Sequence, residues 1–178
     1  MTEYSKLGVV TVAAENVTEE FRLIRRVEVR TPVEFVDWVV DDIPLRELLP
    51  HNPERSLGER TFMTSEPGYG SLAVASLHTL LGEGEEDSGV TFSDGRVGLL
   101  FCESCGDINC PSWSANLEIT ADTVVWREIG SQIDCEPFVR GDGPLPTFTF
   151  DRIEYDTLIR ALLARYQAPP LPSRTLNS

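Results

Sequence analysis

The stretch SANLEITADTVVWREI, residues 114–129, decides the fold class of this chain. Ser114–Thr120 and Thr123–Ile129 read as two short strands, and only Ala121 and Asp122 lie between them. Two residues are the length of a tight β-turn, so the stretch predicts an antiparallel hairpin. The other elements are placed around this hairpin.

Further strands are predicted on both sides of it. Leu7–Ala14 and Phe21–Val29 are rich in β-branched residues, and the polar segment Glu15–Glu20 separates them. They are predicted to form a second hairpin with a longer loop over Glu15–Glu20. Glu34–Val40, Val97–Phe101 and a short segment around Phe148 and Phe150 complete the set of expected strands.

Helices are predicted in three places. Ile43–Leu49 suits one or two turns, with Pro44 near the first position, where its missing N–H costs nothing. Ser71–Leu81 has helical apolar stripes, and Asp151 is an N-cap for a helix over Arg152–Tyr166. Together these elements predict an α+β fold, with two or three helices packed on a mainly antiparallel sheet. Residues 1–167 are expected to form one domain, and the Pro-rich residues 168–178 an extended or disordered tail.

The chain is strongly acidic. Its 29 Asp and Glu residues outnumber 15 Lys and Arg residues, which gives a formal net charge of −14. A surface of this sign repels phosphate backbones, so we expect no nucleic-acid partner. Solubility alone explains the charge, and so does a protein partner with a basic surface, which the charge would attract.

The first residues, Met1 to Lys6, lack the basic start and apolar core of a signal peptide, so a cytoplasmic protein is expected. The longest apolar runs, such as Leu7–Ala14, are too short to cross a bilayer, so no membrane association is expected. In the cytoplasm thiols stay reduced, which favours a metal or redox role for cysteines over structural disulfides. The sequence makes no prediction of oligomeric state.

Three of the four cysteines, Cys102, Cys105 and Cys110, fall within nine residues. The spacing of Cys102 and Cys105 is that of a zinc knuckle, Gly106 relieves the backbone after the second thiol, and Cys110 is placed to return as a third ligand. A tetrahedral zinc site needs a fourth ligand, for which Cys135 is the first candidate and His51 and His78 are the others.

Two alternatives to zinc stay open at this point. The cysteines can be free thiols used as small apolar side chains, or they can take part in redox chemistry. The redox signal is weak because no helix pattern follows Cys102, as it does in thioredoxin-like motifs. Asp107 is expected to hydrogen-bond the backbone of its own loop, and His78 to be a hydrogen-bonded core residue.

The segment from Val97 to Gly130, VGLLFCESCGDINCPSWSANLEITADTVVWREIG, resembles a group of uncharacterised bacterial, largely actinobacterial, proteins. They share an apolar strand, Cys-x-x-Cys-Gly-Asp-x-x-Cys, a β-hairpin and Val-x-Trp. Residues Trp38 to Leu49 are similar to the same group's strand, acidic turn and short helix, whereas Pro111 stands where the group often has glycine. The resemblance implies that this chain has the fold of the group and that its cysteine loop is important. It indicates no activity and no substrate.

These observations support two hypotheses about function. The first is a small acidic protein that acts by binding a partner protein, in the manner of immunity-type or regulatory proteins, with a cysteine loop that holds structural zinc. The alternative is a thiol-dependent enzyme or redox protein that uses the loop of Cys102, Cys105 and Cys110. Whether the chain is an enzyme stays undecided, because two histidines and no serine elbow give poor support to a Ser–His–Asp site.

Overall fold

The computed structural model describes residues 4–22, 25–50, 59–85, 88–102, 105–140 and 143–168. Most of the expected Pro-rich tail, residues 169–178, lies outside these ranges. The strands are β1 (Leu7–Arg22), β2 (Arg25–Val40), β3 (Ile43–Pro44), β4 (Glu59–Arg60), β5 (Val97–Cys102), β6 (Ser112–Ile119), β7 (Thr123–Gln132) and β8 (Phe148–Asp151). The helices are α1 (Leu45–Leu48), α2 (Gly70–Leu80) and α3 (Arg152–Gln167).

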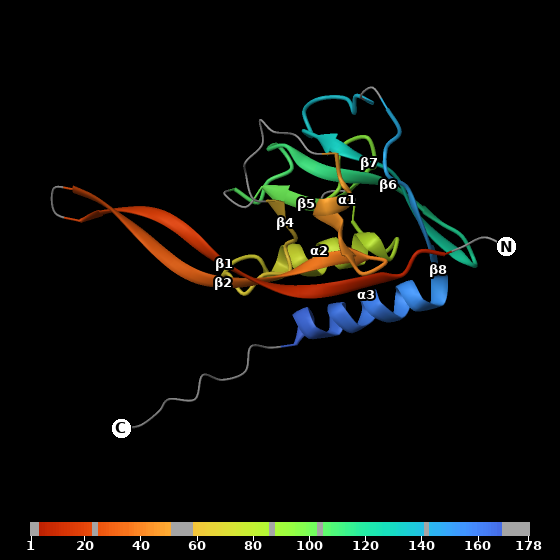
Figure 1. Cartoon of the computed structure of the whole chain (residues 1–178), viewed down its shortest axis with the longest axis horizontal. Helices are drawn as coiled ribbons and strands as arrows, with labels where there is room; N and C mark the ends of the chain where they lie inside the picture. The colour runs from red at the N-terminus through yellow and green to blue at the C-terminus, as the bar shows by residue number, and fades with distance from the viewer. Residues whose placement is uncertain are drawn as a thin grey trace.

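The predicted α+β class is confirmed. The strands form two sheets, in the orders β1-β2-β3 and β4-β5-β6-β7-β8, and every pair of neighbours is antiparallel. Helices α2 and α3 pack against each other, and α3 also contacts β1, β7 and β8 (Figure 1). The two sheets and the two long helices therefore enclose one common core.

The predicted hairpin at residues 114–129 is confirmed as β6 and β7. The two strands pair from Ser112 opposite Gln132 to Ile119 opposite Val124, with Ala121 at the connection. Their register shifts beyond Ser114, where Glu128 has a φ of 53°, so a bulge bends β7 at this point.

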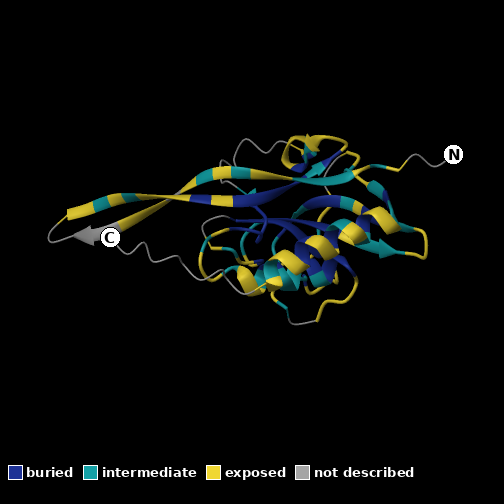
Figure 2. Cartoon of the chain, turned by 90° about the horizontal axis from the view of Figure 1, so that it is seen from below, coloured by how far each residue is buried: buried dark blue, intermediate teal, exposed yellow. Residues whose placement is uncertain are grey.

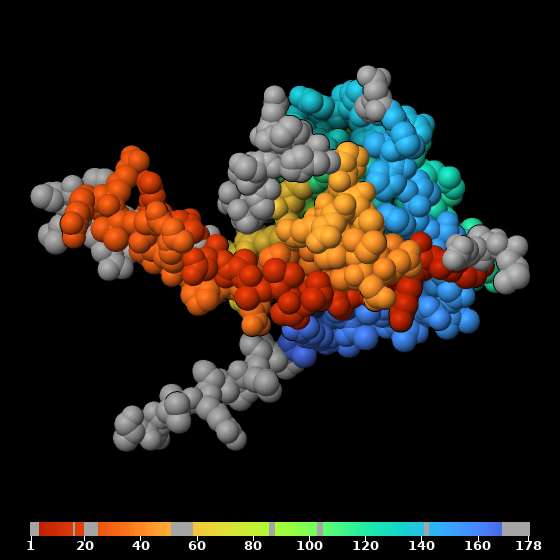
Figure 3. All heavy atoms as spheres, viewed as in Figure 1, coloured from red at the N-terminus to blue at the C-terminus, as the bar shows by residue number. Residues whose placement is uncertain are grey.

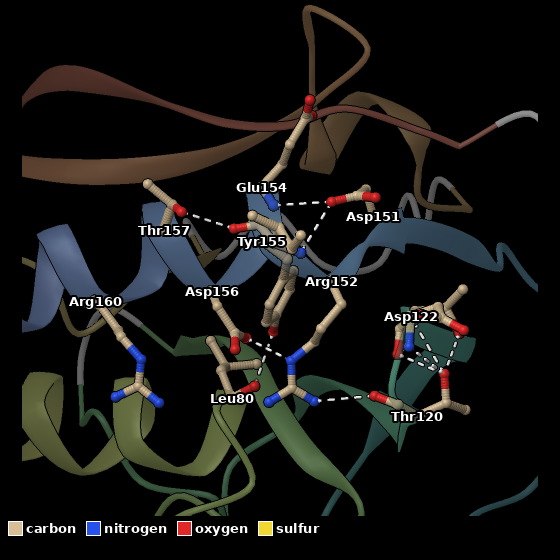
Figure 4. A network of polar contacts seen from close by, with 12 residues as sticks. Leu80, Thr120, Asp122, Asp151, Arg152, Glu154, Tyr155, Asp156, Thr157 and Arg160 are labelled. Carbon is tan, nitrogen blue, oxygen red and sulfur yellow. Dashed lines mark hydrogen bonds and ion pairs between the residues drawn. The ribbon is translucent and has the colours of Figure 1, made fainter.

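Helices are found in the three predicted places, but the first prediction, Ile43–Leu49, is wrong at its start: Ile43 and Pro44 pair with β2 as β3, and α1 begins at Leu45. The carboxylate of Asp151 accepts hydrogen bonds from the backbone N–H groups of Ile153 at 2.9 Å and Glu154 at 3.0 Å, and so caps α3 as expected (Figure 4). In α2, Ala73 and Leu77 are fully buried. Among the described residues no helix is both long and apolar enough to span a membrane.

The prediction of a loop over Glu15–Glu20 is wrong. β1 continues through these residues to Arg22, and it pairs with β2 without a shift from Leu7 opposite Val40 to Arg22 opposite Arg25. Polar residues can continue the strand here because this part of the hairpin is exposed to solvent. A polar residue on an exposed strand keeps its hydration and pays no desolvation cost. The predicted strand Phe21–Val29 is accordingly divided between β1 and β2.

The hairpin of β1 and β2 has two parts with different surroundings. From Glu34 to Val40, β2 lies on the body of the protein, where Val36 donates a backbone hydrogen bond to Met63 at 2.7 Å. Residues 15–22 and 25–32, which we call the arm, project away from the body (Figures 1 and 3). Figure 2 shows the change from buried residues near the body to exposed ones along the arm, where Val17 is 50% exposed.

Aromatic residues from several elements meet in the core. Trp126 of β7 lies edge-on to Trp38 of β2 at 5.6 Å between ring centres and to Phe150 of β8 at 5.2 Å. Its indole N–H donates a hydrogen bond to the hydroxyl of Tyr155 in α3, which in turn donates to the carbonyl of Leu80 in α2. This chain of contacts joins both sheets to both long helices.

Candidate metal centre

The three clustered cysteines lie at the connection between β5 and β6. All six residues of β5 are buried, and Cys102 is the last of them, with 4% of its surface exposed. β5 and β6 are antiparallel neighbours, so the chain must reverse between Cys102 and Ser112. Glu103 and Ser104 lie outside the described residues, and the loop can be followed from Cys105.

Gly106 makes the reversal possible. Its N–H donates a hydrogen bond to the carbonyl of Cys102 at 2.9 Å, and its φ is +59°, in the left-handed region that side chains disfavour. A Cβ atom at position 106 would lie 2.5 Å from a ring carbon of Tyr69. Glycine is therefore required here both by the backbone angle and by the neighbouring ring.

Asp107 holds the second half of the loop. Its carboxylate accepts hydrogen bonds from the backbone and side-chain nitrogens of Asn109, both at 2.9 Å, and its carbonyl accepts one from the N–H of Cys110 at 3.1 Å. The predicted role of Asp107, bonding within its own loop, is confirmed. The result is a compact turn that brings Cys110 back toward Cys102.

The turn gathers the three sulfur atoms. The Sγ atoms of Cys102, Cys105 and Cys110 all lie within 4.8 Å of one another, close enough to bind one metal ion. None of the three forms a disulfide. Cys102 is buried and Cys105 is exposed, so the group faces the core on one side and solvent on the other.

The neighbouring sulfurs change the acidity of Cys110. A hydrogen bond with Cys102, followed by burial and a hydrogen bond with Cys105, raises the pKa of the Cys110 thiol to about 12. Two further sulfurs at this distance oppose a thiolate on Cys110, which makes it a poor nucleophile near neutral pH. A bound cation has the opposite effect, because it removes the protons from coordinating thiols.

The fourth predicted ligand lies nearby but outside the group. Cys135 is exposed, and its sulfur does not join the three that lie within 4.8 Å of one another. The N–H of the preceding residue, Asp134, donates a hydrogen bond to the carbonyl of Ile108 at 3.0 Å. The backbone that carries Cys135 is therefore attached to the cysteine loop.

His78, the other described candidate for the fourth ligand, is not part of the group. His78 lies on α2, where its Nδ1 is 3.4 Å from a carboxylate oxygen of Glu83 and its Nε2 is 3.3 Å from the side-chain nitrogen of Gln167. The expected hydrogen bonding of His78 is found, although its side chain is 33% exposed rather than part of the core. His51 lies outside the described residues.

A surface hollow of about 620 Å³ lies beside the loop. Its described lining residues are Gly89, Thr91, Phe92, Ser93, Gly95, Ile108 and Asp134. Ile108 links it to the loop, but no described cysteine lines it.

Tyr69 is the residue of this site that sequence reasoning missed. It precedes α2, more than 30 positions before the loop, and its ring lies against Gly106 and 5.6 Å from the guanidinium of Arg60. No local pattern marks it, because the contact depends on how α2 packs beside β5.

The chain matches no protein-family model, curated protein or solved structure in the comparisons made.

Proposed function

We propose that this chain is a small acidic protein that acts by binding a protein partner, and that Cys102, Cys105 and Cys110 hold a structural zinc ion. The observation that carries the proposal is the approach of the three sulfurs to within 4.8 Å of one another on a single loop. The class of function is that of immunity-type or regulatory proteins of the cytoplasm, where reduced thiols are free to bind metal.

The distances in the thiol group support zinc. With zinc–sulfur bonds of about 2.3 Å and tetrahedral angles, the sulfurs of a zinc site lie roughly 3.8 Å apart. The three sulfurs therefore need to approach by about 1 Å or less to reach that geometry. Thiolates are also the ligands that soft and borderline metal ions prefer, and calcium and magnesium do not.

Cys135 is the proposed fourth ligand. Its neighbour Asp134 is hydrogen-bonded to Ile108, which lies between Cys105 and Cys110 in the loop. A rearrangement of the exposed Cys135 side chain and its local backbone would then complete the tetrahedron. Zinc bound in this way would attach the segment after β7 to the connection between β5 and β6.

One observation favours binding over catalysis. The pKa of Cys110 is raised to about 12, which leaves this thiol protonated at neutral pH in the metal-free protein. The net charge of −14 favours a partner with a basic surface, and association with such a partner should slow as salt screens the attraction.

Metal analysis of the full chain tests the proposal. Protein purified without chelator should contain one zinc per chain, and Cys105→Ser should lower this content and the unfolding temperature together. Zinc at one hundred times its dissociation constant should stabilise the wild type by about 2.7 kcal/mol. Absence of stoichiometric metal, together with rapid reaction of Cys102 or Cys105 with a thiol probe at neutral pH, would favour the thiol-dependent alternative.

A further inference from the structure

The hollow of about 620 Å³ beside the cysteine loop has the size of a ligand site, since such sites measure roughly 300–1,000 Å³. Its described walls come from three segments of the chain. They are the stretch from Gly89 to Gly95, the cysteine loop at Ile108, and the segment after β7 at Asp134. Segments that are far apart in the sequence therefore meet at one depression in the surface.

Asp134 fastens the three walls to one another. Its carboxylate oxygen Oδ1 accepts a hydrogen bond from the N–H of Ser93 at 2.6 Å, and its carbonyl accepts one from the Ser93 hydroxyl at 3.2 Å. Its own N–H donates to the carbonyl of Ile108 at 3.0 Å. A ligand would thus meet a site that is already formed, and binding would lose little free energy to ordering it.

Half of the Asp134 carboxylate remains available to a ligand. Oδ1 is bonded to Ser93, whereas Oδ2 has no hydrogen bond or ion pair with any residue that the structure describes. The described lining residues include no lysine and no arginine. The hollow therefore offers an acceptor to a cation and holds no described cation of its own.

The bottom of the hollow is apolar. Phe92 and Ile108 line it, with 2% and 8% of their surfaces exposed, and both belong to the hydrophobic core. An occupant that suits both the bottom and the carboxylate has an apolar stem and a cationic end. Lysine and arginine side chains have this composition, because their methylene stems cover apolar surface while the charged group stays at a polar site.

The charge around the hollow has the sign that attracts such a side chain. In residues 88–96, 105–110 and 133–136 there are four acidic residues and one basic residue, Arg96. The guanidinium of Arg96 is buried and donates hydrogen bonds to Ser114 and to the carbonyl of Glu128. The acidic residues are Asp94, Asp107, Asp134 and Glu136.

We infer that this hollow receives a lysine or arginine side chain of the protein partner. The stem lies over Phe92 and Ile108, and the charged end pairs with Oδ2 of Asp134. The inference rests on the proposed binding of a partner with a basic surface, and it names the point at which that partner is anchored. It does not depend on zinc, because the bonds that hold Asp134 run to Ser93 and Ile108.

Nuclear magnetic resonance of the full chain tests the inference, with N-acetyl-arginine N-methylamide as the probe. At an ionic strength of about 0.15 M, long-range attraction to the acidic surface is largely screened, and short-range binding remains. The probe should cause saturable shifts of the backbone amide signals of Gly89, Ser93 and Gly95. Shifts that spread over the surface without concentrating at the hollow would overturn the inference.

Two related probes separate the charge from the stem. N-acetyl-citrulline N-methylamide has the same length as the arginine probe but carries no charge, so it should bind more weakly. A guanidinium compound whose stem is one methylene long keeps the charge and loses the apolar contact, so it should also bind more weakly. Equal binding of the citrulline and arginine probes would contradict the role of Asp134.

Asp134→Asn tests the carboxylate directly. Asparagine keeps a side-chain oxygen that can accept the Ser93 hydrogen bond, so the walls should stay in place while the charge is lost. The affinity for the arginine probe should fall by about three- to fivefold, as for a partly exposed ion pair. The affinity for the citrulline probe should change little, and an unchanged affinity for the arginine probe would overturn the inference.

The matched control is Asp122→Asn. Asp122 is exposed in the connection between β6 and β7, at the other end of β7 from Asp134. The ten residues of β7 span about 33 Å, so the same loss of charge occurs far from the hollow. Asp122→Asn should bind the arginine probe as the wild type does.

A hexa-arginine peptide distinguishes failure of this inference from failure of the proposed function. If the peptide binds in a salt-dependent way but equally to the wild type and Asp134→Asn, binding of a basic partner stands and the hollow is not its anchor. If neither the peptide nor the arginine probe binds, both proposals fail. Weaker binding of both to Asp134→Asn than to Asp122→Asn is the result expected here.

Discussion

The backbone N–H of Asp134 donates a hydrogen bond to the carbonyl oxygen of Ile108 at 3.0 Å. These residues are far apart in the sequence, and the bond attaches the segment that carries Cys135 to the loop that carries the other three cysteines. Asp134 also accepts a hydrogen bond from the N–H of Ser93 at 2.6 Å. The residue before Cys135 is thus held beside the loop by two hydrogen bonds.

This relationship leads to a prediction about the number of sulfur ligands. Protein loaded with Co²⁺ in place of zinc should show charge-transfer absorption that grows with each coordinating thiolate. Cys135→Ser should lower that absorption from the value for four thiolates to the value for three, and weaken metal affinity by about tenfold or more, which is at least about 1.4 kcal/mol.

The matched control for this measurement is Val139→Ser, which introduces serine at a 76% exposed site in the same segment. It should leave the spectrum and the affinity unchanged. If Cys135→Ser had the same spectrum as the wild type, Cys135 would not be a metal ligand, and the proposal for the other three cysteines would stand.

A second prediction concerns Gly106. Replacement by alanine forces a side chain into a φ of +59° and places its Cβ atom 2.5 Å from the ring of Tyr69. The backbone angle costs about 1–2 kcal/mol, and the steric overlap about 1–3 kcal/mol more. Denaturant unfolding of Gly106→Ala should show the total loss.

Gly95→Ala separates the two costs. Gly95 has a φ of +83°, and no atom lies within 4 Å of a Cβ at this position, so only the backbone cost applies. Gly95→Ala should therefore be clearly less destabilising than Gly106→Ala. Equal losses in the two variants would show that the Tyr69 ring moves aside without cost.

A third prediction concerns the buried hydroxyl of Tyr155. It accepts a hydrogen bond from the indole of Trp126 at 3.1 Å. It donates one to the carbonyl of Leu80, also at 3.1 Å (Figure 4). Tyr155→Phe leaves these buried groups without that partner and should cost about 1–3 kcal/mol at neutral pH. Tyr4→Phe, at a 44% exposed site, is the control and should change the free energy of unfolding very little.

The same residue predicts a dependence on alkaline pH. Burial raises the pKa of Tyr155 above its ordinary value near 10, so the native state keeps the proton that the unfolded state loses. The contribution of Tyr155 is therefore complete below about pH 10 and declines as pH rises further, by up to about 1.4 kcal/mol per pH unit. The stability difference between the wild type and Tyr155→Phe should shrink above pH 10, and a difference that stays constant would contradict this explanation.

The parts of the fold that could be predicted are those set by local patterns. The hairpin of β6 and β7 follows from a two-residue connection, and the start of α3 follows from the cap residue Asp151. The two-residue strand β4 could not be predicted, because it exists only through pairing with Phe101 and Cys102 of β5. Tertiary pairing fixes such short strands, and no local preference marks them.

The arm shows why polar composition misled the prediction for Glu15–Glu20. Polar runs usually mark loops because a strand in a sheet normally buries one face. The arm leaves the body, and its charges pair across the strands, as Glu19 does with Arg26.

In the candidate site, the close spacing of Cys102, Cys105 and Cys110 along the sequence was enough to predict that their sulfurs lie together. The contact of Gly106 with Tyr69 could not be predicted, because it depends on the packing of residues far apart in the sequence.

The unequal distribution of apolar residues along β1 and β2 sets the order in which the chain can fold. Pairs far out on the arm, such as Glu19 with Glu28, close a short loop at a small cost in entropy, but both residues are exposed. The apolar contacts of Trp38 lie at the other end of the hairpin and require a long loop to close. The strands should therefore pair first near the body, once Trp38 has packed against Trp126, and then progressively along the arm. We expect high φ-values in folding kinetics for substitutions around Trp38 and values near zero for those at Glu19 and Arg26, so the arm is the last part of the hairpin to form.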